Sequence, residues 1–133
     1  MISSYSDLIQ ASYSQQEPQR LLFVFCRAEL PDEASLEEKA AFERGEGGAL
    51  TPVVCVDKTP DEAPDFNVLS EESQATGQAW DVVFVAAMSG RGGTPPSTDE
   101  AQQPLTMMVE SIRLGHINNY LPLDSQGNAV SLG

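Results

Sequence analysis

The chain has 133 residues, 41% of them hydrophobic, and a formal net charge of −13. This length and composition fit one globular domain with a buried core, so we expect a single domain over residues 1–133. The strong negative charge argues against nucleic-acid and membrane partners, because a phosphate backbone and an anionic lipid surface would both repel the chain.

The start of the chain lacks the pattern of a secretory signal peptide, because Asp7 interrupts what would be the apolar stretch. The longest apolar run, at residues 82–88, is far shorter than the ~20 residues that a membrane-spanning helix needs. We therefore expect a cytoplasmic protein. Both cysteines, Cys26 and Cys55, lie inside apolar strand-like runs, where we expect them to be reduced and shielded from solvent.

Acidic residues are concentrated between residues 29 and 72, a segment that holds 13 of the 20 acids and only three bases. Solvated helix faces explain such a segment, because charged side chains keep exposed surfaces soluble. A basic protein partner is the alternative explanation, since a surface of one charge sign attracts groups of the opposite sign.

Apolar periodicity and helix-capping residues predict alternating helices and strands over the first two thirds of the chain. The run at 82–88 is the most apolar of the strands, which is typical of a strand buried on both faces. In chain order, the expected elements are a helix at residues 4–16, a strand at 20–26, a polar helix at 35–44, a strand at 52–56, a helix at 65–76 and a strand at 82–88.

The last third of the chain contains a helix interrupted by proline and then a hairpin. A single helical turn at 98–102 precedes a main helix that begins at Pro104, since proline is best tolerated at the first position of a helix. Residues 117–123 and 129–132 flank Asp124-Ser-Gln-Gly127, a sequence typical of a hairpin turn.

The resulting order is α-β-α-β-α-β-α-β-β. Helices that alternate with apolar strands predict an α/β fold, with a mostly parallel or mixed sheet that helices cover on both faces and that a C-terminal antiparallel hairpin completes. The alternative is that the short helix at 35–44 is an excursion between two antiparallel strands.

Charged and glycine residues follow the predicted strands. In a parallel sheet, ligands bind beyond the carboxyl ends of the strands, so we expect these residues to form one site. The glycine-rich loop after residue 88 offers backbone N–H groups and leads to a helix N-terminus, which suits an anion or a phosphate. A plain connecting loop has the same composition. The candidate ligand-binding residues are Arg27, Asp57, Lys58, Ser89, Gly90, Arg91, Gly92, Gly93 and Thr94.

No complete catalytic motif is present. The glycine spacing in the loop fits neither a P-loop nor a dinucleotide-binding fingerprint. Asp57-Lys-Thr59 is similar to the start of a phosphorylated-aspartate motif, but Pro60 departs from it and no later acidic pair would hold Mg²⁺. The single histidine, His116, has neither the partners of a triad nor a metal-ligand set beside it. We expect no catalytic residue, metal or cofactor.

Six stretches of the sequence form one set, at residues 21–25, 27–31, 45–50, 56–58, 89–93 and 123–127. Together they resemble a family of small uncharacterised proteobacterial proteins that carry the label "ribonucleotide reductase subunit alpha". The enzyme subunit that this label names is a large barrel with several redox cysteines and a radical site, whereas this chain is short and has two cysteines. We therefore expect the label not to describe the activity of this chain.

Two classes of function follow from these observations. The first is a non-enzymatic binding or regulatory module for a basic protein partner or a small anionic ligand. The alternative is a small enzyme that acts on a phosphorylated or carboxylated metabolite at the strand ends.

Overall fold

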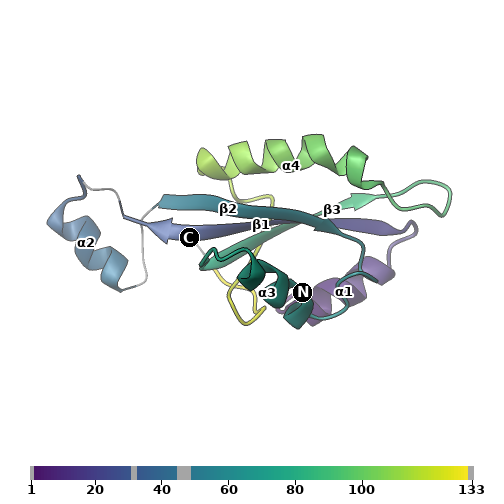
Figure 1. The fold of residues 1–133 in the computed structure, drawn as a ribbon, viewed down its shortest axis with the longest axis horizontal. Helices are drawn as coiled ribbons and strands as arrows, with labels where there is room; N and C mark the ends of the chain where they lie inside the picture. Colours follow the sequence, from purple (N-terminus) through teal and green to yellow (C-terminus); the bar gives the residue numbers. More distant parts are fainter. Residues whose placement is uncertain (1, 31–32, 45–48, 132–133) are drawn as a thin grey trace.

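A computed structural model describes residues 2–30, 33–44 and 49–131 of the chain (Figure 1). Within these residues the chain forms four helices and four strands. The elements are α1 (Tyr5–Tyr13), β1 (Gln19–Glu29), α2 (Leu36–Glu43), β2 (Ala49–Lys58), α3 (Phe66–Ala75), β3 (Val82–Ser89), α4 (Thr98–Arg113) and β4 (Leu121–Leu123).

The strands form one antiparallel sheet in the order β2-β1-β3-β4. The predicted mostly parallel or mixed sheet is therefore wrong, and the alternative of a helical excursion between antiparallel strands describes α2. The error has a physical reason. A continuous apolar run reports burial on both faces of a strand, and helices can cover both faces of an antiparallel sheet as well.

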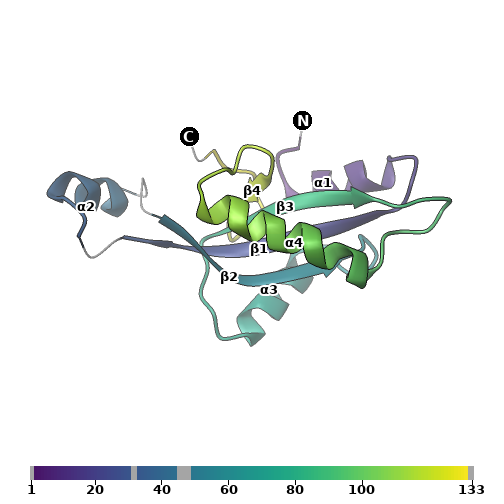
Figure 2. The same ribbon diagram turned by 90° about the horizontal axis from the view of Figure 1, so that it is seen from above.

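Helices pack on both faces of this sheet, as Figures 1 and 2 show. Alternate residues of β1 face opposite sides, because successive side chains of a strand point in opposite directions. Leu21 and Phe23 join the core beneath α1 and α3, whereas Leu22 and Val24 join the core beneath α4. All four side chains are at most 3% exposed, so β1 is the centre of the molecule.

The helix termini agree with the capping residues of the sequence. The capping boxes at Ser35 and Ser97 are both complete, with side chain and backbone bonded reciprocally. The prediction around Pro104 is wrong, because α4 runs through this residue without a break. The predicted final hairpin is reduced to the three residues of β4 and a single bridge between Leu123 and Ala129, while residue 132 lies outside the described part of the chain.

One part of the sheet extends beyond the body of the molecule. The last pair between β1 and β3 is Cys26 with Val82, whereas β1 and β2 stay paired as far as Glu29 and Ala49. Helix α2 lies at the end of this two-stranded extension, away from the other helices (Figures 1 and 2). We call the extension the arm, and its described residues are 27–30, 33–44 and 49–51.

Candidate functional site

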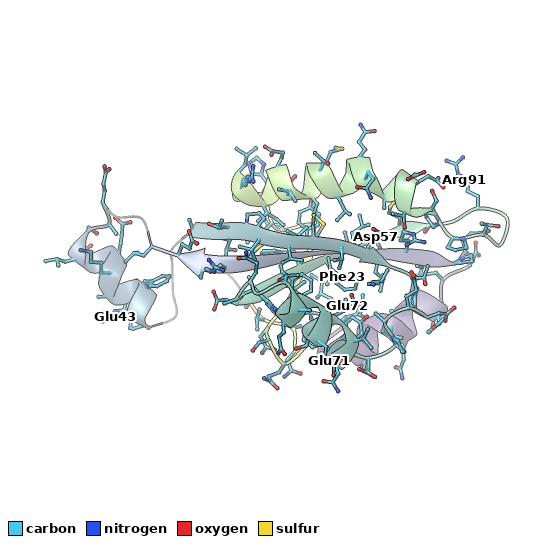
Figure 3. All side chains as sticks on the ribbon, viewed as in Figure 1. Phe23, Glu43, Asp57, Glu71, Glu72 and Arg91 are labelled. Carbon is cyan, nitrogen blue, oxygen red and sulfur yellow. The ribbon has the colours of Figure 1, made fainter. Side chains whose placement is uncertain are left out.

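The antiparallel sheet separates the residues that the sequence predicted as one site. Strands β2 and β3 both run opposite to β1, so Asp57, Lys58 and the 89–94 loop lie at one end of the sheet, beside the start of β1. We call this the loop end. Figure 3 shows Asp57 and Arg91 there, far from Glu43 of α2. Arg27 lies at the opposite end, so the predicted single cluster does not include it.

Arg27 fastens the base of the arm to the body. Its guanidinium donates to the carbonyl of Ala79 at 3.1 Å and to the side chain of Gln78 at 3.0 Å. Beside it, the N–H of Ala28 donates to the carboxylate of Asp81 at 2.7 Å. This N–H points toward β3, which begins only at residue 82, so the carboxylate replaces the missing strand partner.

Asp57 and Lys58 point to opposite faces of the sheet. The carboxylate of Asp57 accepts hydrogen bonds from Arg20 at 2.7 Å and from the Thr98 hydroxyl at 2.9 Å, while Lys58 pairs with Glu72 of α3 at 3.0 Å. The Asp57 and Arg20 side chains are each only 12% exposed. The same Asp57 oxygen serves both donors, so this carboxylate joins β1, β2 and the start of α4.

Sequence reasoning missed Arg20, which stands next to the apolar run of β1. The signal was the two-residue spacing that places Arg20 on the same face of the strand as Leu22 and Val24. In the structure its guanidinium also donates to the carbonyl of Pro96 at 2.5 Å. Arg20 therefore supplies the positive charge at the loop end that Arg27 was expected to supply.

The glycine-rich loop is a tight two-residue turn. Arg91 and Thr94 exchange backbone hydrogen bonds at 2.9 and 3.0 Å, and Gly92 and Gly93 between them have φ values of +58° and +84°. Two consecutive positive φ values are typical of a hairpin turn that favours glycine. The N–H of Gly93 donates to the carboxylate of Glu17 at 2.8 Å, so a side chain of the protein itself occupies this part of the loop.

Position 90 requires glycine, because two backbone carbonyl groups lie too close to leave room for a Cβ atom. A Cβ atom at this position would lie 2.0 Å from the carbonyl oxygen of Thr94 and 2.9 Å from that of Pro18. The N–H of Gly90 donates to the same Pro18 carbonyl at 2.8 Å. The glycines of the loop therefore have conformational reasons that do not involve a ligand.

A hollow of about 540 Å³ opens beside this loop. Its walls are the last turn of α1, the connection at residues 15–19, the connection at residues 59–61 and Pro95. Glu17 and Asp61 bring two carboxylates to it, and none of its lining residues is basic. Tyr13 donates its hydroxyl hydrogen to Asp61, and this hydrogen bond raises the pKa of Tyr13 above its ordinary value.

The two cysteines differ in exposure. Cys26 is fully buried in β1, and burial raises the pKa of its thiol to about 12. Cys55 is exposed, so the prediction that both thiols are shielded is wrong for this residue. The reason is the position of β2 at the edge of the sheet, where α4 only partly covers it.

Two observations on the described residues limit the kinds of site. No group of three or more His, Cys, Asp or Glu side chains in residues 2–30, 33–44 and 49–131 could hold a metal ion. None of the helices in this part of the chain is both long and apolar enough to cross a membrane. Comparisons of the chain with protein-family models, with curated proteins and with solved structures found no match.

Proposed function

We propose that this protein is a non-enzymatic binding module whose arm docks onto a basic protein partner. The observation that carries the proposal is helix α2, none of whose side chains is fully buried among the residues that the structure describes. Leu36 at its start is 84% exposed, whereas Ala41 and Phe42 are half-buried. Isolated helices as short as α2 are marginal in water, so a partner surface that covers α2 would add packing to that of the described residues.

The charge of the arm favours a basic partner. Between residues 33 and 44 the chain carries four glutamates against one lysine and one arginine. Complementary charge speeds the encounter of two proteins and selects among partners. Glu37 and Glu43 are exposed on α2, and Figure 3 shows Glu43 well apart from the other labelled residues.

The base of the arm supports a role in recognition. The contacts of Arg27 and Ala28 with residues 78–81 hold the β1 strand of the arm against residues that precede β3. A strand that is already oriented loses less conformational entropy when a partner binds. The arm thus combines an exposed acidic helix with an anchored strand at its base.

The contacts at the loop end favour binding over catalysis. Asp57, the side chain with the most nucleophile-like sequence context, is paired with Arg20 and bonded to Thr98. A nucleophilic carboxylate would need an accessible oxygen aimed at substrate and a group that stabilises the developing charge. The described residues offer neither arrangement around Asp57.

The test compares two charge-reversed variants of equal net charge. Glu37→Lys/Glu43→Lys changes α2, and Glu71→Lys/Glu110→Lys makes the same change on exposed positions of α3 and α4. A partner is first captured by cross-linking in a lysate, identified by mass spectrometry and purified. Its affinity for the wild type and both variants is then measured by calorimetry at low and high salt.

We expect the α2 variant to bind the purified partner about tenfold more weakly or worse, and the α3/α4 variant to bind within about twofold of the wild type. Affinity should also fall as salt rises, because exposed charges are screened beyond ~8 Å at physiological ionic strength. The proposal is contradicted if the partner binds both variants with equal affinity, or if only the α3/α4 variant loses binding. Either result would show that the arm is not part of the interface.

A further inference from the structure

The hollow at the loop end has a strongly one-sided charge. Glu17 and Asp61 are its charged lining residues. Each uses one carboxylate oxygen inside the protein, Glu17 toward the N–H of Gly93 and Asp61 toward the hydroxyl of Tyr13. The second oxygen of each accepts no hydrogen bond from the residues that the structure describes. Both carboxylates therefore have acceptor capacity left for a bound group.

Helix α1 adds to this negative potential. Its last turn, which carries no basic side chain, lines the hollow. The C-terminal end of a helix carries a partial negative charge from its aligned peptide dipoles, and that charge favours a cation within about one turn. Two carboxylates and a helix C-terminus thus converge on one depression.

The wall of the hollow suits an organic cation. Tyr13 is 58% exposed and lines the hollow, and aromatic faces attract ammonium and guanidinium groups. Pro18, Pro60 and Pro95 line the same depression and offer apolar contact to an alkyl stem. A divalent metal fits less well, because Ca²⁺ takes six to eight oxygen ligands and the hollow has two carboxylates.

We propose that this hollow binds the alkylguanidinium or alkylammonium group of a cationic ligand. The head group lies between Glu17 and Asp61, and the alkyl stem lies along Tyr13 and the prolines. The proposal is independent of the arm, which lies at the opposite end of the sheet. A negative result for the arm therefore does not affect the proposal for the hollow, and the reverse also holds.

The experiment uses the full chain labelled with ¹⁵N and four probes. The cations are butylguanidinium and butylammonium, and 1-butanol is the neutral control of similar length. The peptide acetyl-Gly-Arg-Gly-amide carries the same guanidinium on a backbone. We expect the cations to bind with a dissociation constant of roughly 1 mM and to shift the amide signals of residues 12–19 and 59–61, apart from the prolines at 18 and 60, which have no N–H. Butanol should leave these signals unchanged.

The peptide distinguishes two sources of the cation. Binding of the peptide as well as butylguanidinium assigns the hollow to an arginine side chain of a protein. Binding of the small cations without the peptide assigns it to a free amine or guanidine. Either result supports the site, whereas saturating cation that leaves the signals of residues 12–19 and 59–61 in place overturns it.

Charge-removing variants test the two carboxylates separately. Glu17→Gln and Asp61→Asn keep an oxygen acceptor for Gly93 and Tyr13, and each should weaken cation binding about two- to fivefold. Glu37→Gln removes the same charge from α2 and should leave the affinity unchanged, since it lies beyond the screening distance. If all three variants weaken cation binding equally, the loss of affinity reflects only the net charge of the protein, and the proposed site is wrong.

Discussion

Arg20 and Asp57 form an ion pair at 2.7 Å that joins the centre of the sheet to its edge strand. Both side chains are only 12% exposed, and the hydroxyl of Thr98 donates to the same carboxylate oxygen. The pair therefore fixes the start of α4 over two strands. Removal of one partner from a mostly buried pair leaves the other charge without compensation.

Asp57→Ala should lower the free energy of unfolding by about 2 kcal/mol, because Arg20 would remain largely buried with only the Pro96 carbonyl and the more distant Glu62 carboxylate, at 3.7 Å, as partners. Urea unfolding followed by the fluorescence of Trp80 measures this change. Lys58→Ala is the matched control, since its pair with Glu72 is more exposed and should cost less than about 1 kcal/mol. Equal losses in both variants would show that the Arg20–Asp57 pair has no special role.

The thiols should react at different rates. Cys55 is exposed and should be modified by a small disulfide reagent in the native protein, whereas Cys26 should react only after unfolding, because burial raises its pKa and blocks access. Mass spectrometry of the modified protein locates the label. Rapid native modification of Cys26 would contradict its place at the centre of the sheet.

Two glycines of the same φ should differ in their tolerance of alanine. Gly115 and Gly127 both have φ +80°, but a Cβ atom at Gly127 would lie 2.9 Å from Cγ of Phe66, whereas one at Gly115 meets nothing within 4 Å. Gly115→Ala should cost about 1 kcal/mol from backbone strain alone. Gly127→Ala should cost at least about 1 kcal/mol more, because Phe66 must also move. If urea unfolding shows equal losses of stability in the two variants, Phe66 does not lie against Gly127.

Two carboxyls should make stability depend on acid pH. The N–H groups of Thr59 and Ser97 hold the pKa values of Glu62 and Glu100 below their ordinary value of 4.5. A lowered folded-state pKa contributes stability above the unfolded value, and that contribution is lost as pH falls through the folded value. Unfolding midpoints should therefore drop as pH falls below 4.5, the ordinary value of these carboxyls.

Glu62→Gln/Glu100→Gln tests this assignment. The double variant should lose less stability than the wild type over the same pH interval, since glutamine does not titrate. Glu37→Gln/Glu43→Gln makes the same charge change on α2 and serves as the control. If both double variants follow the wild-type pH curve, the acid sensitivity arises from other carboxyls.

Local interactions made part of this fold predictable from the sequence. The caps at Ser35 and Ser97 bond to residues three positions away, so their signal lies within a few residues of sequence. Apolar runs likewise located β1 and β3, because residues 21–26 of β1 and residues 82–85 of β3 are buried on both faces of the sheet. Residues 86–88 of the same apolar run are not fully buried, so the prediction that this strand is buried on both faces holds only for its first half. Asp57 and the 89–94 loop lie at the same end of the sheet, on the two strands that flank β1.

The sequence alone located the first six helices and strands, but only the tertiary structure decided strand direction, the course of the chain through Pro104 and what each strand end meets. Strand direction depends on pairing between residues far apart in the chain, and burial on both faces is the same for parallel and antiparallel strands. Direction then placed Arg20 rather than Arg27 beside Asp57. It also left Cys55 exposed at the sheet edge, and long-range packing set Gly127 against Phe66.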